Sequence, residues 1–353
     1  MDKLKNIIVN PGITIKQALK RMDDAGEKTL LVTDVNQRLL GTVTDGDIRR
    51  WILQGKKLNK SVALVMNKCP FILKEGFTQE EAKDLFVSKV IECVPILDSK
   101  HRIVSALRWP DLFEGKLKEY KPINLPVVIM AGGEGTRLSP FTNILPKALI
   151  PVGDKPIIDL IIDKFIQFSC REIFLSINHK SNILKAYFSD IKRDCNITYI
   201  EENKPLGTIG SLYLLRDRIK KTFILSNCDI LIDADYGDIL KFHKDNKNDI
   251  TLIVSLKHYT IPYGICEIEN GGLLRRIKEK PEYDFLVNTG SYIMEPSVLK
   301  AIPKNKCYHA TDLIGDYIAR KKKIGVYPVS EKSWLDVGQW EEYHKNLKNF
   351  EIK

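Results

Sequence analysis

The sequence predicts an α/β protein in which a mostly parallel sheet with helices on both faces follows a smaller α+β module. Three observations support this prediction. After residue 127, short apolar runs typical of buried strands alternate with stretches of helical periodicity. The first of these runs leads directly into a glycine-rich loop. Before residue 116, two related halves recur with a constant offset of 64 residues, as between Asp34 and Asp98.

Composition limits the class of protein. The chain has 353 residues, enough for two domains, and its 44% hydrophobic and 28% charged content is ordinary for a globular protein in water. It has no apolar run long enough to span a membrane and no apolar signal-peptide core, so we expect a cytoplasmic protein without membrane contact. The seven cysteines include no CxxC pair, which argues against a zinc site and a disulfide framework.

The charge balance indicates the kind of ligand. A net charge of +10 suits small molecules that are rich in phosphate. The lysines are spread along the chain and are not clustered with aromatic residues, so we expect no nucleic-acid binding.

The first third of the chain is the repeat. Residues 30–48 align with residues 94–112, and this alignment pairs Asp47 with Asp111. Each half reads as helix, strand, strand and helix, because a stretch of helical periodicity precedes two β-rich runs that a polar turn joins. In the first half these elements are expected at residues 15–25, 30–33, 39–43 and 45–53.

The predicted domains follow from this pattern. Two repeat domains are expected over residues 1–60 and 61–115. A linker is expected over residues 116–126, which are polar and carry two prolines. The sheet domain then covers residues 127–353. Its helices are expected at residues 155–168, 182–188 and 341–350, and its later strands at residues 172–178, 197–201, 222–225, 250–257, 263–269 and 287–294.

The glycine-rich loop carries the clearest chemistry. A buried strand over residues 127–130 ends at Ala131, and Gly132, Gly133 and Gly135 follow. Open α/β sheets bind ligands at the carboxyl ends of their strands. Glycines let the backbone approach a phosphate and turn its N–H groups toward it. The spacing matches neither the P-loop nor the dinucleotide-binding fingerprint, so a different phosphate-binding loop is expected.

Two cationic side chains accompany this loop. Arg137 follows the last glycine by two residues, and Lys147 stands behind a proline. The loop therefore offers backbone donors, a planar guanidinium and an ammonium group. GGEGTRL and the later LPKALIPV resemble the signature of sugar-1-phosphate nucleotidyltransferases. These enzymes join a nucleoside triphosphate to a sugar 1-phosphate and release pyrophosphate, and the resemblance implies a Rossmann-like sheet.

The resemblance implies a role for each residue of the loop. Arg137 would hold the β- and γ-phosphates, and Lys147 would neutralise the region of the α-phosphate and the incoming phosphate. These two residues are the expected catalytic residues. The expected nucleotide-binding residues of this loop are Ala131, Gly132, Gly133, Gly135 and Thr136.

A second motif, KPLGTIG, follows the strand expected at residues 197–201. A helix is expected from about Ser211, and the free N–H groups at a helix start favour an anion or the edge of a base. The motif resembles the PLGTAG sequence of the same family, which implies that Pro205, Gly207 and Thr208 bind the nucleotide. Its PLGT form is most similar to guanylyltransferases that act on mannose or heptose 1-phosphates, which favours GTP.

Two aspartates are the expected ligands of Mg²⁺. Asp229 follows a buried strand, where a carboxylate needs a partner for its charge. It resembles the family aspartate that holds Mg²⁺ beneath the triphosphate, although the two residues before it depart from the family pattern. Asp336 lies in WLDVG, which resembles the WxDIG motif of the second metal-binding aspartate. Asp233 and Asp235 are expected to cap a helix or to face solvent.

Three further motifs resemble the sugar-phosphate site of this family. In PYG, Gly264 would let the sugar ring approach. In EKP, Glu279 would contact sugar hydroxyls and Lys280 would contact the sugar phosphate. In NTGSYI, Asn288 would bind a hydroxyl and Gly290 would leave room for the ring.

The repeat resembles a tandem pair of cystathionine-β-synthase (CBS) domains, whose clefts often hold adenosine nucleotides. Thr44 and Asp47 match the ribose-binding Thr-x-x-Asp pattern of that family. The second half keeps Asp111 but has Arg108 in place of the threonine. Two interpretations stay open: an adenosine nucleotide bound through Thr44, Asp47 and Asp111, or a purely structural module. CBS pairs commonly associate, so a homo-oligomer is expected by analogy.

The order of the domains is similar to that of bacterial glucosamine-1-phosphate guanylyltransferases of the legionaminic acid pathway. The resemblance therefore implies GTP, glucosamine 1-phosphate and Mg²⁺ as substrates and cofactor. Alternatives are a mannose- or heptose-1-phosphate guanylyltransferase, an enzyme that uses UTP or CTP, and a catalytically silent subunit that senses nucleotides.

Overall fold

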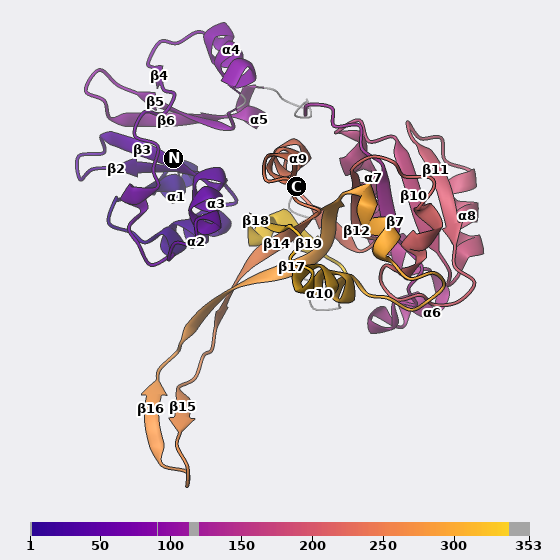
Figure 1. Ribbon diagram of the computed structural model, residues 1–353. Helices are drawn as coiled ribbons and strands as arrows, with labels where there is room; N and C mark the ends of the chain where they lie inside the picture. The colour runs from indigo at the N-terminus through magenta and orange to yellow at the C-terminus, as the bar shows by residue number, and fades with distance from the viewer. Residues whose placement is uncertain (1, 90, 113–119, 339–353) are drawn as a thin grey trace. The chain divides into compact units, whose positions relative to one another are not determined.

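The computed structural model describes residues 2–89, 91–112 and 120–338 (Figure 1). The chain forms two compact units, Met1–Lys118 and Glu119–Lys353. Within the described ranges, none of the helices has the length and apolar character needed to cross a membrane.

The first unit contains two three-stranded sheets of the same design. In each sheet, a short first strand lies parallel to the second, and the second pairs with the third in a hairpin. The first half comprises α1 (Asp2–Ile7), β1 (Ile8–Val9), α2 (Ile15–Ala25), β2 (Thr29–Thr33), β3 (Leu39–Thr44) and α3 (Asp45–Leu53). After η1 (Val62–Leu64), the second half comprises β4 (Leu73–Lys74), α4 (Gln79–Lys89), β5 (Cys93–Leu97), β6 (Ile103–Arg108) and α5 (Trp109–Leu112).

The polar turns of the two hairpins repeat the same chemistry. Asp34 Oδ1 accepts hydrogen bonds from two backbone N–H groups of its turn, both at 2.8 Å. Asp98 Oδ1 does the same in the second half, at 2.9 and 2.8 Å. Gln37 and His101, again 64 residues apart, both adopt the left-handed backbone conformation, with φ of 62° and 65°. The helix, strand, strand and helix order expected for each half is confirmed.

The second unit is built on a seven-stranded sheet with the order β11-β10-β7-β12-β17-β14-β18. The first four of these strands are mutually parallel, β14 and β18 are parallel, and β17 is antiparallel to both of its neighbours. The predicted mostly parallel α/β fold is therefore confirmed.

The sheet strands are β7 (Val127–Met130), β10 (Glu172–Ile177), β11 (Asn196–Glu201), β12 (Phe223–Asn227), β14 (Ile250–Thr260), β17 (Glu282–Met294) and β18 (Ile324–Val329). Two-stranded pairs are formed by β8 (Pro151–Val152) with β9 (Lys155–Pro156), β13 (Ile230–Ile232) with β19 (Trp334–Asp336), and β15 (Ile265–Ile268) with β16 (Leu274–Lys278). The α-helices are α6 (Phe141–Ile144), α7 (Ile157–Ile166), α8 (Ser181–Ser189), α9 (Tyr236–Asp245) and α10 (Ala310–Ala319). The 3₁₀ turns are η2 (Thr136–Leu138), η3 (Lys147–Leu149), η4 (Gly210–Leu215), η5 (Pro296–Ala301) and η6 (Glu331–Ser333).

The sheet separates two apolar layers. Val127 and Ile129 of β7 pack in one layer, which contains buried side chains of α7, α8 and α9. Val128, between them, packs in the other layer, which contains side chains of η4, η5 and α10. Neighbouring strand residues point to opposite faces, so a continuous apolar run is required where both faces are covered.

Three expected elements differ from the prediction or fall outside the described ranges. The helix expected from Ser211 is the 3₁₀ segment η4 and not an α-helix. The helix expected at residues 155–168 begins only at Ile157, because the two residues before it form β9. The helix expected at residues 341–350 lies outside the described residues, as do residues 116–119 of the expected linker.

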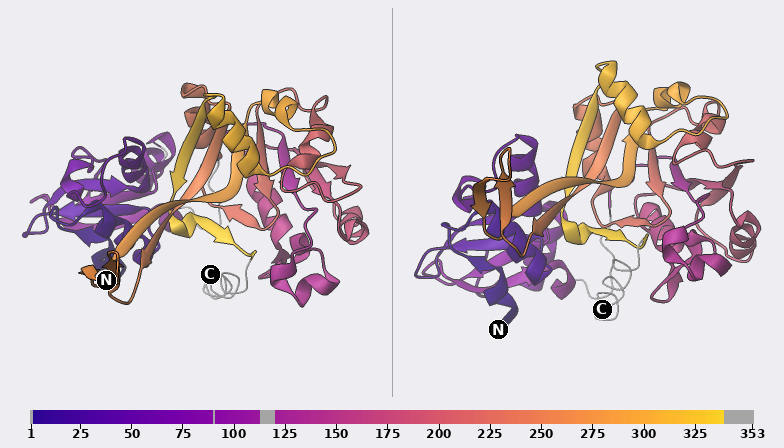
Figure 2. Two further views of the ribbon diagram at one scale, coloured as in Figure 1. Left: turned by 60° about the horizontal axis from the view of Figure 1, so that its bottom comes forward. Right: turned by 90° about the horizontal axis from the view of Figure 1, so that it is seen from below.

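The antiparallel strands β14 and β17 continue beyond the sheet as a two-stranded ribbon. Their pairing runs from Val254 opposite Asn288 to Thr260 opposite Glu282, and the β15–β16 hairpin closes the far end. Figures 1 and 2 show this ribbon extending away from the body of the sheet. We call residues 254–288 the ribbon.

A buried histidine makes the stability of the second unit depend on pH. His243 of α9 is 1% exposed; its Nδ1 lies 2.8 Å from Thr251 Oγ1 and its Nε2 lies 3.1 Å from Glu295 Oε1. Burial lowers its pKa, and this effect outweighs the opposing influence of Glu295 and Asp249. Below a pH of about 6.5 the unfolded chain therefore takes up a proton that the folded chain does not, and the free energy of unfolding falls as the pH falls.

We expect hydrogen exchange of β14 amides to report this loss. Between pH 7.5 and 5.5, after correction for intrinsic exchange rates, protection should fall further in the wild type than in His243→Gln, which cannot be protonated. An equal fall in both proteins would exclude His243 as the cause.

Candidate active site

The two predicted phosphate-site segments meet at one edge of the sheet. β7 and β12 are adjacent and parallel, with Met130 opposite Asn227. The N–H of Cys228 donates to the carbonyl of Met130 at 3.2 Å. The glycine-rich loop after β7 and Asp229 after β12 therefore leave the sheet side by side, as expected for the carboxyl ends of parallel strands.

An ion pair lies at the centre of this edge. The ammonium group of Lys147, on η3, pairs with Oδ2 of Asp229. Burial alone would lower the pKa of Lys147, but the charge of Asp229 and smaller contributions from Cys228 and Asp336 more than offset it and raise the pKa. Lys147 is therefore a cation at neutral pH.

The neighbouring thiol stays neutral. Burial, together with the charge of Asp229, raises the pKa of Cys228 to about 12. A thiol with this pKa carries no charge at neutral pH and is not a nucleophile there. The cysteine before Asp229, where the sequence departs from the family pattern, thus adds no charge to the site.

Asp336 reaches the same place through a second strand pair. β19 pairs with β13, which places Asp336 opposite Ile230, and the N–H of Val337 donates to the carbonyl of Asp229 at 3.1 Å. A Cβ atom on Gly338 would contact Oδ2 of Asp229 and would lie 2.9 Å from Oδ1 of Asp336. A side chain at this position would have to displace both carboxylates, because they approach its Cα.

The two carboxylates fit a magnesium ion as a partial ligand set. Mg²⁺ prefers hard oxygen ligands and usually keeps water and substrate phosphates among them. In the described part of the chain, no group of three or more His, Cys, Asp or Glu residues forms a complete metal cage. Asp229 and Asp336 would therefore hold the ion only together with phosphate oxygens and water.

The glycine-rich loop folds back onto the segment that carries Lys147. The hydroxyl of Thr142 donates to the carbonyl of Gly135 at 2.9 Å, and Gly135 lies against the side chain of Lys147. A Cβ on Gly133 would meet no atom within 4 Å, so the loop backbone is open there. Ala131 is buried and its N–H donates to a neighbouring strand at 2.8 Å. The loop is therefore anchored at its ends and open at Gly133.

Arg137 is not part of the central ion-pair group. Thr136 and Arg137 lie on η2, and both are exposed. None of the contacts found among the described residues joins Arg137 to Lys147 or to the two aspartates. The structure thus places Arg137 on the loop but does not bring it to the carboxylates.

The second motif is held by a distant segment. Gly207 has a φ of 78°, and a Cβ there would lie 2.7 Å from the carbonyl oxygen of Tyr308. The N–H of Ala310 donates to the hydroxyl of Thr208 at 2.9 Å. The resemblance implied that this glycine packs against a base. In the structure its Cα faces the backbone of Tyr308, and exposed Pro205 begins the turn.

The predicted sugar-phosphate residues lie in two places. Gly290 packs against Asn227 at the edge of the sheet, and Asn288 Oδ1 accepts a hydrogen bond from its N–H at 3.1 Å. Glu279 and Gly264 adjoin each other at the far end of the ribbon, because Glu279 Oε2 would lie 2.9 Å from a Cβ on Gly264. Lys280 follows Glu279 there, with a φ of 41°. One chain does not assemble the five residues into a single pocket.

The predicted CBS ligands have structural roles in their own helices. The Thr44 hydroxyl and N–H both donate to Asp47 Oδ2, at 2.7 and 2.8 Å, and this capping box begins α3. In the second half, the Arg108 N–H donates to Asp111 Oδ2 at 2.9 Å. Both carboxylates therefore already accept hydrogen bonds from the protein.

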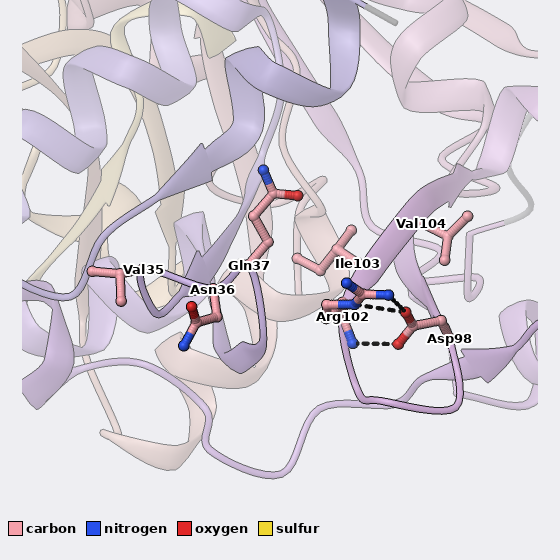
Figure 3. Close-up of a pocket in the computed structure, with 7 residues that line it drawn as sticks. All are labelled: Val35, Asn36, Gln37, Asp98, Arg102, Ile103 and Val104. Atoms are coloured by element: carbon pink, nitrogen blue, oxygen red, sulfur yellow. Dashed lines mark hydrogen bonds and ion pairs between the residues drawn. The ribbon is translucent and has the colours of Figure 1, made fainter.

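A cavity of about 440 Å³ opens elsewhere in the first unit, beside the two hairpin turns (Figure 3). Asp98 and Arg102, which line it, form an ion pair at 2.8 Å. Neither residue belongs to the predicted CBS ligands.

Sequence reasoning missed Glu202, which links the two nucleotide-site loops. Its Oε1 accepts a hydrogen bond from the hydroxyl of Ser176 at 2.7 Å and lies 3.2 Å from where a Cβ on Gly132 would be. Its Oε2 accepts a hydrogen bond from the N–H of Leu206 at 3.2 Å. The sequence did contain a signal for this role. Glu202 is a polar residue directly after the strand predicted at residues 197–201, which places it at the sheet edge where ligands bind.

Comparison with known proteins places these features in a family. Mannose-1-phosphate guanyltransferase of Schizosaccharomyces pombe is 31% identical over 229 residues, which cover 62% of each chain. UTP–glucose-1-phosphate uridylyltransferase of Synechocystis sp. is 28% identical over 250 residues, which cover 64% of this chain and 63% of that protein. The matched region thus spans less than two thirds of either relative.

Solved structures and family models also relate this chain to nucleotidyltransferases. HddC from Yersinia pseudotuberculosis superposes with a TM-score of 0.51 and 24% identity, covering 64% of this chain and 99% of that one, which shows a shared fold. Residues 1–54 match the CBS domain family. Residues 126–351 match the family described as nucleotidyl transferase, and because this match covers more than half of the chain, the protein belongs to that family.

Proposed function

We propose that the protein is a sugar-1-phosphate nucleotidyltransferase, which joins a nucleoside triphosphate to a sugar 1-phosphate and releases pyrophosphate. The observation that carries this proposal is the convergence of Lys147, Asp229 and Asp336 on Gly338, beside an open glycine-rich loop. One cation and two carboxylates at the carboxyl ends of parallel strands suit a phosphate chain with a bound metal ion.

The proposed reaction is an in-line displacement at the α-phosphorus. A phosphate oxygen of the sugar 1-phosphate forms the new P–O bond, and the bond to pyrophosphate breaks. The nucleophile is already an anion, so the protein needs no general base, and catalysis consists of positioning and charge neutralisation. Mg²⁺ held by Asp229 and Asp336 would supply neutralising charge at the phosphates. Lys147 stabilises charge at the α-phosphate, and Arg137 binds the leaving phosphates from the open loop.

The proposed substrates are GTP and glucosamine 1-phosphate. The PLGT motif supports GTP as the nucleotide. The similarity to the mannose-1-phosphate guanyltransferase of Schizosaccharomyces pombe supports a sugar 1-phosphate as the acceptor. The domain order supports glucosamine 1-phosphate, for the synthesis of legionaminic acid. Mannose or heptose 1-phosphate is the alternative acceptor. The CBS module would bind an adenosine nucleotide or join copies of the chain in a homo-oligomer.

Substrate identity is tested by measuring pyrophosphate release with Mg²⁺ for four nucleoside triphosphates against glucosamine, N-acetylglucosamine, glucose, mannose and mannoheptose 1-phosphates. We expect the highest kcat/KM for GTP with glucosamine 1-phosphate. A maximum at another pair would keep the reaction and replace the substrate. No turnover with any pair, with and without adenosine nucleotides, would contradict the proposed function and favour a nucleotide-sensing subunit.

Replacement of Lys147 tests its role in neutralising charge. We expect Lys147→Met to lower kcat by about 10²–10³-fold, the loss typical of one preorganised charge-stabilising group. Lys155→Ala is the matched control, because this exposed lysine pairs with Asp163 away from the site and should keep normal turnover. Equal kcat values in the two variants would remove Lys147 from the mechanism.

Replacement of the aspartates tests the metal site. Asp229→Asn and Asp336→Asn should each raise the Mg²⁺ concentration needed for half-maximal turnover and weaken Mn²⁺ binding measured by electron paramagnetic resonance with a non-hydrolysable nucleotide. Asp233→Asn is the control, because Asp233 pairs with Lys164 at 2.8 Å. Unchanged Mn²⁺ binding in both site variants, or full activity in EDTA, would refute the assignment.

A further inference from the structure

The ribbon exposes an unusual amount of apolar surface. Eight large apolar side chains between residues 259 and 286 are at least 46% exposed. An isolated two-stranded ribbon is only marginally stable in water, and an exposed apolar patch usually marks an interaction site. The ribbon therefore requires a partner surface.

The hairpin at the end of the ribbon has one apolar face. Cys266 lies opposite Ile277, and Ile268 lies opposite Leu274, so these four side chains share a face. The next pair between them, Glu267 with Arg276, points to the other face. By the same register Gly264 and Glu279 continue the apolar face. A surface that covers this face would therefore also meet Glu279.

The stem of the ribbon carries a cluster of aromatic rings. Tyr259 and Phe285 are 52% and 51% exposed, and their ring centroids lie 6.1 Å apart. Tyr283 stacks on Phe285, also at 6.1 Å. Exposed aromatic clusters of this kind are enriched in the centres of protein interfaces.

The base of the ribbon is fixed. Thr289 is 2% exposed, and its hydroxyl donates to the carbonyl of Ile253 at 2.7 Å. The register shift at Ile253–Val254 lies at this base, and from Val254 to Thr260 the pairing with β17 is continuous. At about 3.4 Å per residue, Glu282 lies roughly 20 Å along the ribbon from Asn288. Glu279 and Lys280 are therefore beyond the reach of their own sheet edge in this arrangement.

We propose that the ribbon embraces a second copy of this chain and delivers Glu279 and Lys280 to the sheet-edge site of that copy. Each active site would then combine Lys147, Asp229 and Asp336 of one copy with the ribbon end of the other. This inference rests on the proposed function, because it assigns the two residues to the sugar phosphate.

Size and charge favour a second copy as the partner. The eight exposed side chains present on the order of 100 Å² each, or about 800 Å² per copy over both faces of the ribbon, which is comparable to the area that one partner buries in a standard stable interface. A two-fold axis makes each ribbon cover the other copy, so no apolar ribbon remains exposed. Lys280 brings a cation to the end of the ribbon, which complements the two carboxylates and the phosphates of the sheet-edge site.

Purified heterodimers of the full-length chain test the proposal. Asp229→Asn inactivates the sheet edge, and Lys280→Ala inactivates the ribbon end, so each homodimer should lose about 10²-fold or more in turnover. Co-expression with two different affinity tags gives the mixed dimer. A shared site predicts half of the wild-type turnover in this dimer, because one of its two sites combines an intact edge with an intact ribbon. A site within one chain predicts none.

A reciprocal pair gives the matched control. When the double variant Asp229→Asn/Lys280→Ala is paired with wild type, a shared site predicts no turnover and a site within one chain predicts half. Lys278→Ala, on the opposite face of the hairpin, should keep turnover near the wild-type level. Restored activity only in the second heterodimer, or normal turnover of the Lys280→Ala homodimer, would overturn the proposal.

Light scattering tests the interface independently of turnover. The wild type should be a dimer or a higher assembly, and Ile277→Ser/Phe285→Ser should shift it toward smaller species, since both side chains are exposed in the single chain. A monomeric wild type would overturn the shared site even if the enzyme were active. A dimer without turnover on any substrate would instead contradict the proposed function. In that case, cross-linking of the ribbon to the sheet edge of the second copy would still test whether the ribbon binds there.

Discussion

The ion pair between Lys147 and Asp229 is the interaction on which the candidate active site depends. Its partners come from η3 and from the end of β12, and Asp336 joins them because β19 pairs with β13. Removing two charges from water costs more free energy than an exposed ion pair returns, so stability alone does not account for this arrangement. Before any substrate arrives, it holds a charged ammonium and two carboxylates in position, which is how preorganised sites stabilise a transition state.

Local patterns predicted most of the fold, because most helices and strands of this chain have the residue periodicity that is typical of the structure they adopt. The helix expected at residues 45–53 is α3, and in the structure Thr44 and Asp47 form the capping box that begins it. The buried strand β7 is readable from four apolar residues before a glycine, because only a strand covered on both faces needs such a run. The repeat was visible for the same reason, since equivalent turns require equivalent aspartates.

What the sequence did not predict depends on segments that are far apart in the chain. Gly207 is recognisable as a special position, but its neighbour Tyr308 is supplied by a segment about one hundred residues later. The ribbon is a second case. The side chains of its strands alternate between two faces as they do in the sheet. No local signal in β14 or β17 marks where the sheet ends and the exposed ribbon begins. The motifs around Glu279 and Asn288 therefore looked like parts of one site, although the ladder separates them.

The two halves of the CBS module are alike in backbone but differ at one charge. Arg108 stands where the first half has Thr44, and its guanidinium pairs with Glu27 of the first half and with Asp111 of its own. A ligand that used Asp111 would have to displace this guanidinium from its carboxylates, which costs the energy of a partly buried pair. A ligand that used Asp47 would compete with a capping box and with Arg50 on the surface. The difference in charge thus makes the halves unequal as binding sites, and only the first half retains the full Thr-x-x-Asp pattern.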